Sequence, residues 1–319
     1  GASAGRAPRR SSRCSGSQAP SKATAPPISA ASAKAREQTD GIAKDKLFGL
    51  GLGAQRCGST WIGKYLSNHP EFYISSTKEM HIFDALRHQK KHPLLRRFNE
   101  SENFRLPPDQ DDILKIYQGK KKYYAYFDER IEILHTAFGE ITPEYSLLGK
   151  QFLKVIEESH PNIRYFVSLR RPISRYLSAL SYYGRNRPKF NIEKNYMQGL
   201  QKKLFCHYTR YTLNIENLFS IVPKEKIHFL FYEDLFNGTT DTLFGLCDHL
   251  EISKIAPEKI NLSLSKIVNS TDSRAKIRKP NHEEMKAIYN KFQSEYKNLS
   301  SLISKQLPES WEKDIATYG

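Results

Sequence analysis

Residues 47–66 read LFGLGLGAQRCGSTWIGKYL, and this stretch decides the fold. Its first part, residues 47–52, is apolar except for its glycines and predicts a buried parallel strand. A turn is expected over residues 53–58, followed by a helix that Ser59 or Thr60 caps. Because free backbone N–H groups and the positive end of a helix then meet at one point, the pattern predicts a phosphate-binding site.

The loop departs from the nucleotide-triphosphate loop at one informative position. Gly53 and Gly58 have the Gly-x4-Gly spacing, but Ser59 stands where that motif requires Lys. That Lys reaches the β- and γ-phosphates beside a magnesium ion. Here the positive charge is Arg56, inside the loop. The pattern therefore favours a ligand with one terminal phosphate and a different group to transfer.

Residues 56–61, RCGSTW, resemble the 5′-phosphosulfate loop of the sulfotransferases, which use 3′-phosphoadenosine 5′-phosphosulfate (PAPS). The family usually has Lys at the position of Arg56. The resemblance implies that the following residues bind the donor: Arg56, Cys57, Gly58, Ser59, Thr60 and Trp61.

A second unit begins with the strand predicted at residues 164–169, which breaks at Arg170-Arg171-Pro172 before a helix over residues 173–183. The planar guanidinium of Arg binds two phosphate oxygens at once. The segment LRRPISRYLS resembles the sulfotransferase 3′-phosphate motif, in which an Arg and a Ser eight residues later hold the 3′-phosphate. These positions are Arg170 and Ser178.

Residues 78–84, KEMHIFD, resemble a segment of the glycan O-sulfotransferases. The resemblance implies that Glu79 is the general base for the acceptor hydroxyl, and His81 could share or replace that role.

Two further segments resemble the family with departures. Residues 138–145, FGEITPEY, look like the family's Glu-Lys-Thr-Pro-x-Tyr, with Ile141 in place of the Lys. Residues 276–280, KIRKP, resemble the late loop that closes over the nucleotide. The resemblance assigns Lys276 and Arg278 to this loop.

Strands that alternate with helices predict a single α/β domain with a central, mostly parallel sheet flanked by helices, which is the fold that the resemblance implies. Ligands bind beyond the carboxyl ends of such strands. Further strands are expected at residues 71–74, from residue 138 until Pro143 stops the strand, and at 227–232. Further helices are expected at 129–137, 151–159, 204–219, 240–250 and 283–303.

The chain of 319 residues carries a net charge of +16. Residues 1–36 contain basic residues and no acid, so we expect a disordered basic leader over residues 1–44 and the sulfotransferase domain over 45–319. Residues 85–122 are polar and interrupt the pattern, which indicates an insertion on the acceptor side. A basic protein favours anionic ligands.

The sequence leaves the cellular compartment of the protein open. Four cysteines do not form a disulfide framework, and the leader resembles an organellar transit segment, which favours a soluble protein of the cytoplasm or an organelle. Five Asn-x-Ser/Thr sequences keep the Golgi lumen possible for a chain that has lost an anchor. No membrane span is expected.

The resemblance implies sulfuryl transfer from PAPS to an acceptor hydroxyl by in-line displacement, which gives PAP (adenosine 3′,5′-bisphosphate) and a sulfate ester without a metal. The acceptor is an anionic glycan or a small-molecule alcohol; no nucleic acid partner is expected, and oligomeric state is open.

Three alternatives compete with this interpretation. A kinase-like phosphotransferase would use Glu233 and Asp234 at a strand end, and a thiol phosphatase would use Cys57 at a helix N-terminus. A non-catalytic module that binds heparin or nucleic acid would use the basic clusters at 87–97 and 120–124.

Overall fold

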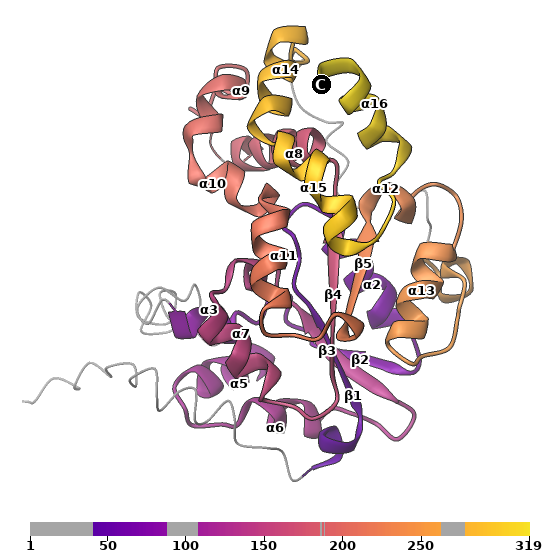
Figure 1. Cartoon of the computed structure of the whole chain (residues 1–319). Coiled ribbons are helices and arrows are strands. Elements are labelled where there is room, and N and C mark those ends of the chain that lie inside the picture. The colour runs from indigo at the N-terminus through magenta and orange to yellow at the C-terminus, as the bar shows by residue number, and fades with distance from the viewer. Residues whose placement is uncertain (1–40, 88–107, 186, 188, 263–277) are drawn as a thin grey trace, which may run out of the picture.

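The computed structural model describes residues 41–87, 108–185, 187, 189–262 and 278–319. The expectations for most of the leader, for residues 88–107 of the insertion and for Lys276 lie outside these residues. Five strands form one sheet in the order β2-β3-β1-β4-β5, and every neighbouring pair is parallel (Figure 1). Their bounds are β1 Leu47–Gly51, β2 Phe72–Ile74, β3 Ala137–Ile141, β4 Ile163–Leu169 and β5 Ile227–Phe231. The α/β prediction is confirmed.

Strand β1 is the central strand of the sheet, and all five of its residues are buried. Phe48 and Leu50 face one hydrophobic cluster. Gly49 lies opposite the second cluster, where a Cβ would approach Leu250 Cδ2 to 2.8 Å. The glycine therefore lets a neighbouring side chain lie directly across the strand.

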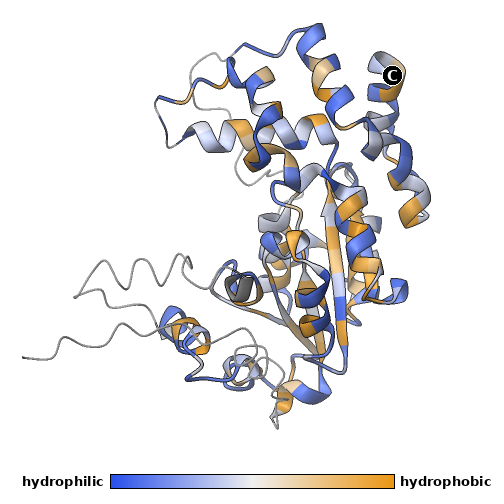
Figure 2. Ribbon diagram, turned by 60° about the vertical axis from the view of Figure 1, so that its left-hand side comes forward, coloured by the Kyte–Doolittle hydropathy of each residue, from blue (hydrophilic) through white to orange (hydrophobic). Residues whose placement is uncertain are grey.

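Helices cover both faces of the sheet and its carboxyl edge (Figure 1). One face is covered by α2 Ser59–Asn68 and α13 Asp241–His249, and the other by α6 Tyr123–Asp128, α7 Lys150–Glu157 and α11 Tyr211–Phe219. Most of these helices carry both apolar and polar residues (Figure 2), as expected for helices with one face on a core. The helices α3 Ile82–Arg87 and α5 Pro108–Tyr117 pack beside α7 and α6, and α12 Tyr232–Leu235 directly follows β5.

A helical layer lies beyond the carboxyl ends of β4 and β5 (Figure 1). It consists of α8 Pro172–Arg185, α9 Asn195–Gln198, α10 Lys203–Cys206, α14 His282–Lys291, α15 Gln293–Ile303 and α16 Glu309–Tyr318. The 3₁₀ turns are η1 Ile42–Asp45, η2 Pro143–Leu147, η3 Gly199–Gln201, η4 His207–Thr209, η5 Lys224–Lys226 and η6 Pro257–Ile260.

Three helix predictions were wrong. The helix expected at 204–219 is interrupted by η4, which separates α10 from α11. The helix expected at residues 129–137 is absent there; α6 ends at Asp128, because its aromatic residues pack into the core. The helix expected at 283–303 is broken at Phe292, whose side chain is buried and packs against Tyr176 with ring centroids 5.9 Å apart. A further helix, α16, was missed.

Two boundaries also differ from expectation. Neither Ser59 nor Thr60 caps α2: the N-cap is Gly58, with φ of +96° and no side-chain hydrogen bond. The leader boundary at residue 44 falls inside η1, where Ala43 is buried and its N–H donates to Asp128 at 2.8 Å. Residues 42–45 therefore belong to the folded part of the chain.

Within the residues that the structure describes, no helix combines the length and the apolar character that crossing a bilayer requires.

Candidate active site

The loop after β1 turns back on itself at three residues in the left-handed region. These are Gly53, Arg56 and Gly58, with φ of +94°, +71° and +96°. The loop is tied to the neighbouring strand β4, because Ala54 N donates to Ser168 O at 2.8 Å. The fold therefore aims both the loop and the N-terminus of α2 at the carboxyl edge of the sheet, where backbone N–H groups attract an anion.

The two predicted phosphate motifs meet at this edge. Arg56 Nε donates to Ser178 Oγ at 3.1 Å, and the Arg56 guanidinium lies over the Tyr182 ring at 4.7 Å. Arg170 Nη1 donates to Arg56 O at 3.1 Å, while the Arg170 guanidinium lies over the Tyr232 ring at 4.1 Å. Residues more than a hundred positions apart thus form one cationic cluster.

This cluster has the electrostatics of an anion site. Burial and the nearby charges of Arg185 and Arg170 lower the pKa of Arg56. Arg170 Nε is buried and has no hydrogen-bond partner among the residues that the structure describes. A buried donor without an acceptor, surrounded by like charges, is costly in free energy unless an anion accepts its hydrogen bond. The residues therefore fit a phosphate group.

Arg185 is a part of the cluster that the sequence analysis missed. The signal was present in the spacing, because Ser178, Tyr182 and Arg185 are separated by four and three residues and so share one face of α8. The spacing indicates a shared site only once the structure shows that Arg56 lies against that face of α8.

Arg171, although adjacent to Arg170, has a structural role. Its backbone N–H donates to Glu233 Oε1 at 3.0 Å, and its side chain donates to Ser174 at 2.9 Å. Glu233 Oε2 also accepts from Trp311 Nε1 at 3.1 Å. A carboxylate held in this way supports the strand end and is not available as the metal ligand that the kinase interpretation needs.

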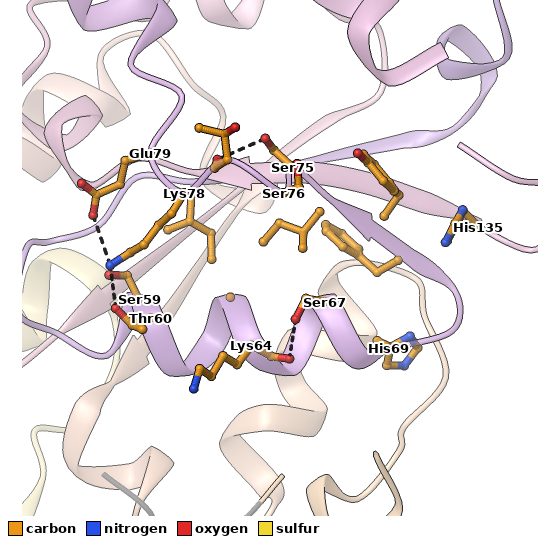
Figure 3. Close-up of a pocket in the computed structure, with 16 residues that line it drawn as sticks. Ser59, Thr60, Lys64, Ser67, His69, Ser75, Ser76, Lys78, Glu79 and His135 are labelled. Carbon is orange, nitrogen blue, oxygen red and sulfur yellow. Dashed lines mark hydrogen bonds and ion pairs between the residues drawn. The ribbon is translucent and has the colours of Figure 1, made fainter. Parts of the chain in front are cut away.

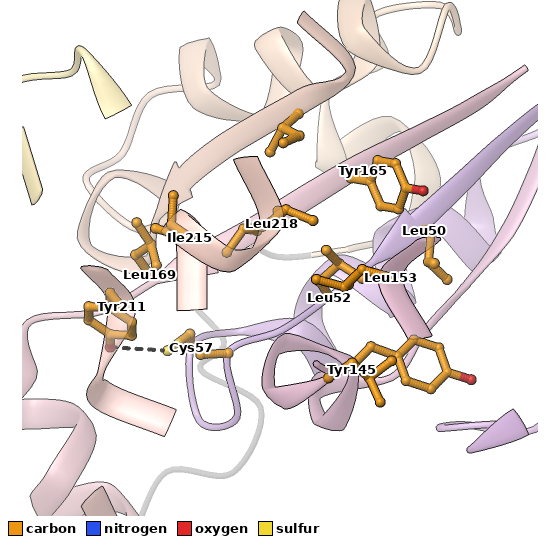
Figure 4. Packing of buried hydrophobic residues seen from close by; sticks show 14 of the residues in the cluster. Leu50, Leu52, Cys57, Tyr145, Leu153, Tyr165, Leu169, Tyr211, Ile215 and Leu218 are labelled. Carbon is orange, nitrogen blue, oxygen red and sulfur yellow. Dashed lines mark hydrogen bonds between the residues drawn. The ribbon is translucent and has the colours of Figure 1, made fainter. Parts of the chain in front are cut away.

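Cys57 and Trp61 are buried and support the loop by packing into the core. The Cys57 thiol is fully buried, and burial raises its pKa to about 11. It lies 3.7 Å from the Tyr211 hydroxyl (Figure 4), which donates to Arg170 O at 2.8 Å. The Trp61 ring is 2% exposed and stacks on Tyr65. A thiol that is buried and protonated at neutral pH is not a nucleophile, so the phosphatase interpretation is wrong.

The Lys78–His81 loop joins the site from β2. Lys78 Nζ donates to Thr60 Oγ1 at 2.8 Å and lies 3.6 Å from Glu79 Oε1 (Figure 3). Glu79 and His81 both adopt left-handed backbone conformations, with φ of +60° and +57°. The loop therefore brings the Glu79 carboxylate to the first turn of α2.

The charges around His81 separate the two candidates for the general base. His81 Nδ1 lies 2.8 Å from Asp84 Oδ2, and Nε2 lies 3.7 Å from Glu79 Oε2 and 4.0 Å from Glu144 Oε2. Burial disfavours the imidazolium, but these carboxylates outweigh it and raise the pKa of His81 to about 10. Burial likewise opposes ionisation of Glu79, yet His81 and Lys78 lower its pKa below the usual value. At neutral pH Glu79 is therefore an ionised carboxylate and His81 is a cation.

The buried Glu140 side chain anchors the Lys78–His81 loop through hydrogen bonds. Its Oε1 accepts from the Tyr123 hydroxyl at 2.7 Å and the Tyr145 hydroxyl at 3.0 Å. Its Oε2 accepts from Thr142 Oγ1 at 2.8 Å and from Met80 N at 3.3 Å. Burial raises the pKa of Glu140, and the three hydroxyls oppose that rise. This carboxylate of β3 thus anchors Met80, the residue between Glu79 and His81.

Glu79, His81 and Glu144 also have the spacing of a metal cluster, with possible ligand atoms within 4.8 Å of one another. The raised pKa of His81 places an imidazolium between the carboxylates. A metal ion would have to displace that proton.

Arg278 lies apart from the arginine cluster. Its guanidinium donates to both carboxylate oxygens of Glu284, at 2.6 and 2.7 Å, and lies 3.5 Å from Glu193. Glu284 forms the capping box at the start of α14 with Asn281. Arg278 therefore fastens this helix, and the structure does not describe Lys276.

The fold and the site define a class: an α/β protein with a cationic cluster at the loop after its first strand and a carboxylate beside it. Residues 50–256 match the sequence profile of the Sulfotransferase family. That is more than half of the chain, and the chain therefore belongs to this family and is a sulfotransferase-family enzyme.

Two solved structures share the fold. A sulfotransferase from Alicyclobacillus acidocaldarius has 19% identical residues and a TM-score of 0.56, with 84% of this chain and 98% of that chain covered. The sulfotransferase domain of the olefin synthase from Synechococcus PCC 7002 has 18% identity and a TM-score of 0.51, covering 88% and 96%. Comparison with curated proteins gave no match.

Proposed function

We propose that the enzyme transfers the sulfuryl group of PAPS to an acceptor hydroxyl and releases PAP and a sulfate ester. The observation that carries this proposal is the cluster of Arg56, Arg170 and Ser178 at the N-terminus of α2, linked to Glu79 through the Lys78–Thr60 hydrogen bond. The cluster is suited to two phosphate groups, and the carboxylate is suited to an incoming hydroxyl.

In the reaction that we propose, the acceptor oxygen attacks the sulfur in line with the leaving phosphate oxygen. The new sulfur–oxygen bond forms as the old one breaks, the hydroxyl proton goes to Glu79, and the electron pair leaves on the 5′-phosphate of PAP. Arg56 and the backbone N–H groups of the loop stabilise the charge that develops there, and Lys78 lies at the same helix end.

The binding-module alternative has weaker support. The aromatic residues of the cluster at 120–124 are Tyr123 and Tyr124, which are 2% and 1% exposed and cannot stack on bases. Lys121 is paired with Asp112 at 2.9 Å and with Glu129 at 2.6 Å.

Calorimetric titration with PAP, beside ATP with magnesium, tests the proposal. We expect selective PAP binding that Arg170→Ala weakens by about 10-fold to 100-fold, because the variant removes charge-assisted hydrogen bonds. Arg187→Ala is the matched control, since Arg187 stacks on Tyr183 outside the cluster. A protein that prefers ATP with magnesium, or does not bind PAP, would contradict the proposal.

A further inference from the structure

An elongated cavity of about 500 Å³ runs between α2 and β2 (Figure 3). Thr60, Lys78 and Glu79 line one end, and His69 and His135 line the other. The cavity therefore opens at the proposed base and extends away from the nucleotide cluster along the first helix.

The middle of this groove is apolar. Phe72 and Ile74 of β2 and Ile141 of β3 lie among its lining residues. Among the lining residues in the described part of the chain, Glu79 is the one carboxylate. Along the helix side, Lys64 is the cation among the lining residues that the structure describes. A polyanionic chain would need cations along its whole length, which this lining does not offer.

Gly63 is an independent sign of room for a ligand. It lies inside α2 without a positive φ, where glycine costs up to about 1 kcal/mol relative to Ala. A Cβ there would lie 3.6 Å from Ile141 Cδ1 and 4.0 Å from Ile74 Cδ1, which is ordinary contact. Backbone geometry and packing therefore do not require glycine, whereas a larger side chain would fill the groove.

We propose, resting on the proposed function, that the acceptor is an alcohol carried on an elongated apolar body. Its hydroxyl lies at Glu79 and its chain follows α2 from Ser59 to Ser67, a rise of about 12 Å. The hydroxyl proton passes to Glu79, the alcohol oxygen bonds to sulfur, and the sulfur–oxygen bond to the phosphate breaks. The products are an alkyl sulfate ester and PAP.

The experiment measures PAP release from PAPS with butanol, hexanol, octanol and decanol as acceptors. Burial of each added methylene in the groove should raise kcat/KM by about fourfold until the groove is filled. Gly63→Leu should abolish this gain, while Gly63→Ala, which adds only the Cβ, should keep it. Leu also favours the helix, so the variant should keep its fold and its PAP affinity.

Ser67→Leu provides a second variant at an exposed position near the far end of the groove. It should shorten the groove, so that decanol loses its advantage while hexanol keeps its own. A rate independent of chain length, or a chain-length gain that survives in Gly63→Leu, would overturn the inference. So would a preference for desulfated heparin over every alcohol. In these cases PAP still binds, whereas failure of PAP binding would overturn the proposed function itself.

Discussion

The chemical roles of Glu79 and His81 are set by their neighbours. Both residues lie in one short segment, and by their ordinary pKa values His81 would be the natural base at neutral pH. Asp84 and Glu144 reverse this assignment by holding a proton on the imidazole, which leaves the Glu79 carboxylate as the base that we propose.

The first prediction concerns pH. Because the pKa of His81 is raised to about 10, its cation persists through neutral pH and is lost only as the pH rises through that value. Because the pKa of Glu79 is lowered, its carboxylate persists to more acidic pH than usual. We therefore expect the transfer rate, measured as PAP release, to be level across neutral pH and to fall at acidic pH, where the Glu79 carboxylate becomes protonated.

An NMR titration of the imidazole groups checks this prediction, with His135 as the internal control because burial lowers its pKa. His81→Ala removes the cation between the carboxylates, and it should shift the acid limb of the rate profile upward. A His81 that titrates near its ordinary value of 6.5 would refute the assignment.

At the scale of elements, the segment between β2 and α3 contains two residues in left-handed backbone conformations, Glu79 and His81, which are separated by one residue. Such conformations are unfavourable for residues other than glycine and persist only where surrounding contacts hold them. Glu140 supplies such a contact by accepting from Met80 N, and Tyr145 adds another by accepting from Ile82 N at 3.0 Å.

We therefore predict that Glu140→Gln disturbs this segment. The amide nitrogen replaces an oxygen that accepts two donors, so the free energy of unfolding should fall by about 1–3 kcal/mol. The pKa of His81 should fall as its carboxylate neighbours move away, while PAP affinity is retained. Denaturant unfolding measures the free energy of unfolding, NMR titration measures the pKa of His81, and calorimetry measures PAP affinity.

Glu295→Gln is the matched control for this prediction. Glu295 is 4% exposed and accepts from Thr212 N and Oγ1 at 2.7 and 2.8 Å, away from the segment. It should lower stability without changing the pKa of His81. If both variants leave that pKa unchanged, Glu140 does not position the segment.

At the scale of the whole molecule, the C-terminal helix α16 supports the site indirectly, by packing against the strand ends that carry it. Trp311 is fully buried, packs against Phe231 with ring centroids 5.4 Å apart and donates to Glu233. Asp314 accepts from the Tyr296 hydroxyl at 2.7 Å. The last helix of the chain therefore fastens the ends of β4 and β5, on which Arg170 depends.

We predict that Trp311→Ala lowers the free energy of unfolding by about 3–5 kcal/mol, because it leaves a cavity and an unpaired Glu233. PAP affinity should fall as well. Lys313→Ala on the exposed face of the same helix should change stability by less than about 0.5 kcal/mol. Denaturant unfolding and calorimetry test this, and equal effects of the two substitutions would show that the helix does not support the site.

Elements with strong local patterns were predictable from the sequence. The strand, loop and helix of residues 47–66 follow from apolar runs and glycines that act within a few residues, and so do β4, β5 and the sheet class. The helix expected at 129–137 failed because aromatic burial moved it to α6. The break at Phe292 followed from packing against Tyr176, which lies more than a hundred residues away.

From the sequence, spacing and residue type predicted the α/β sheet and two candidate phosphate-binding segments, because such patterns act over a short range of the chain. The resemblance of those segments indicated the sulfotransferase family. Only the tertiary structure decided which residues act together. It brought Arg185 to Arg56, assigned Arg171 to the strand end and Arg278 to a helix cap, and placed Glu144 beside His81. The physical reason is that charge, burial and the pKa values they produce depend on distances through space, and the fold sets those distances.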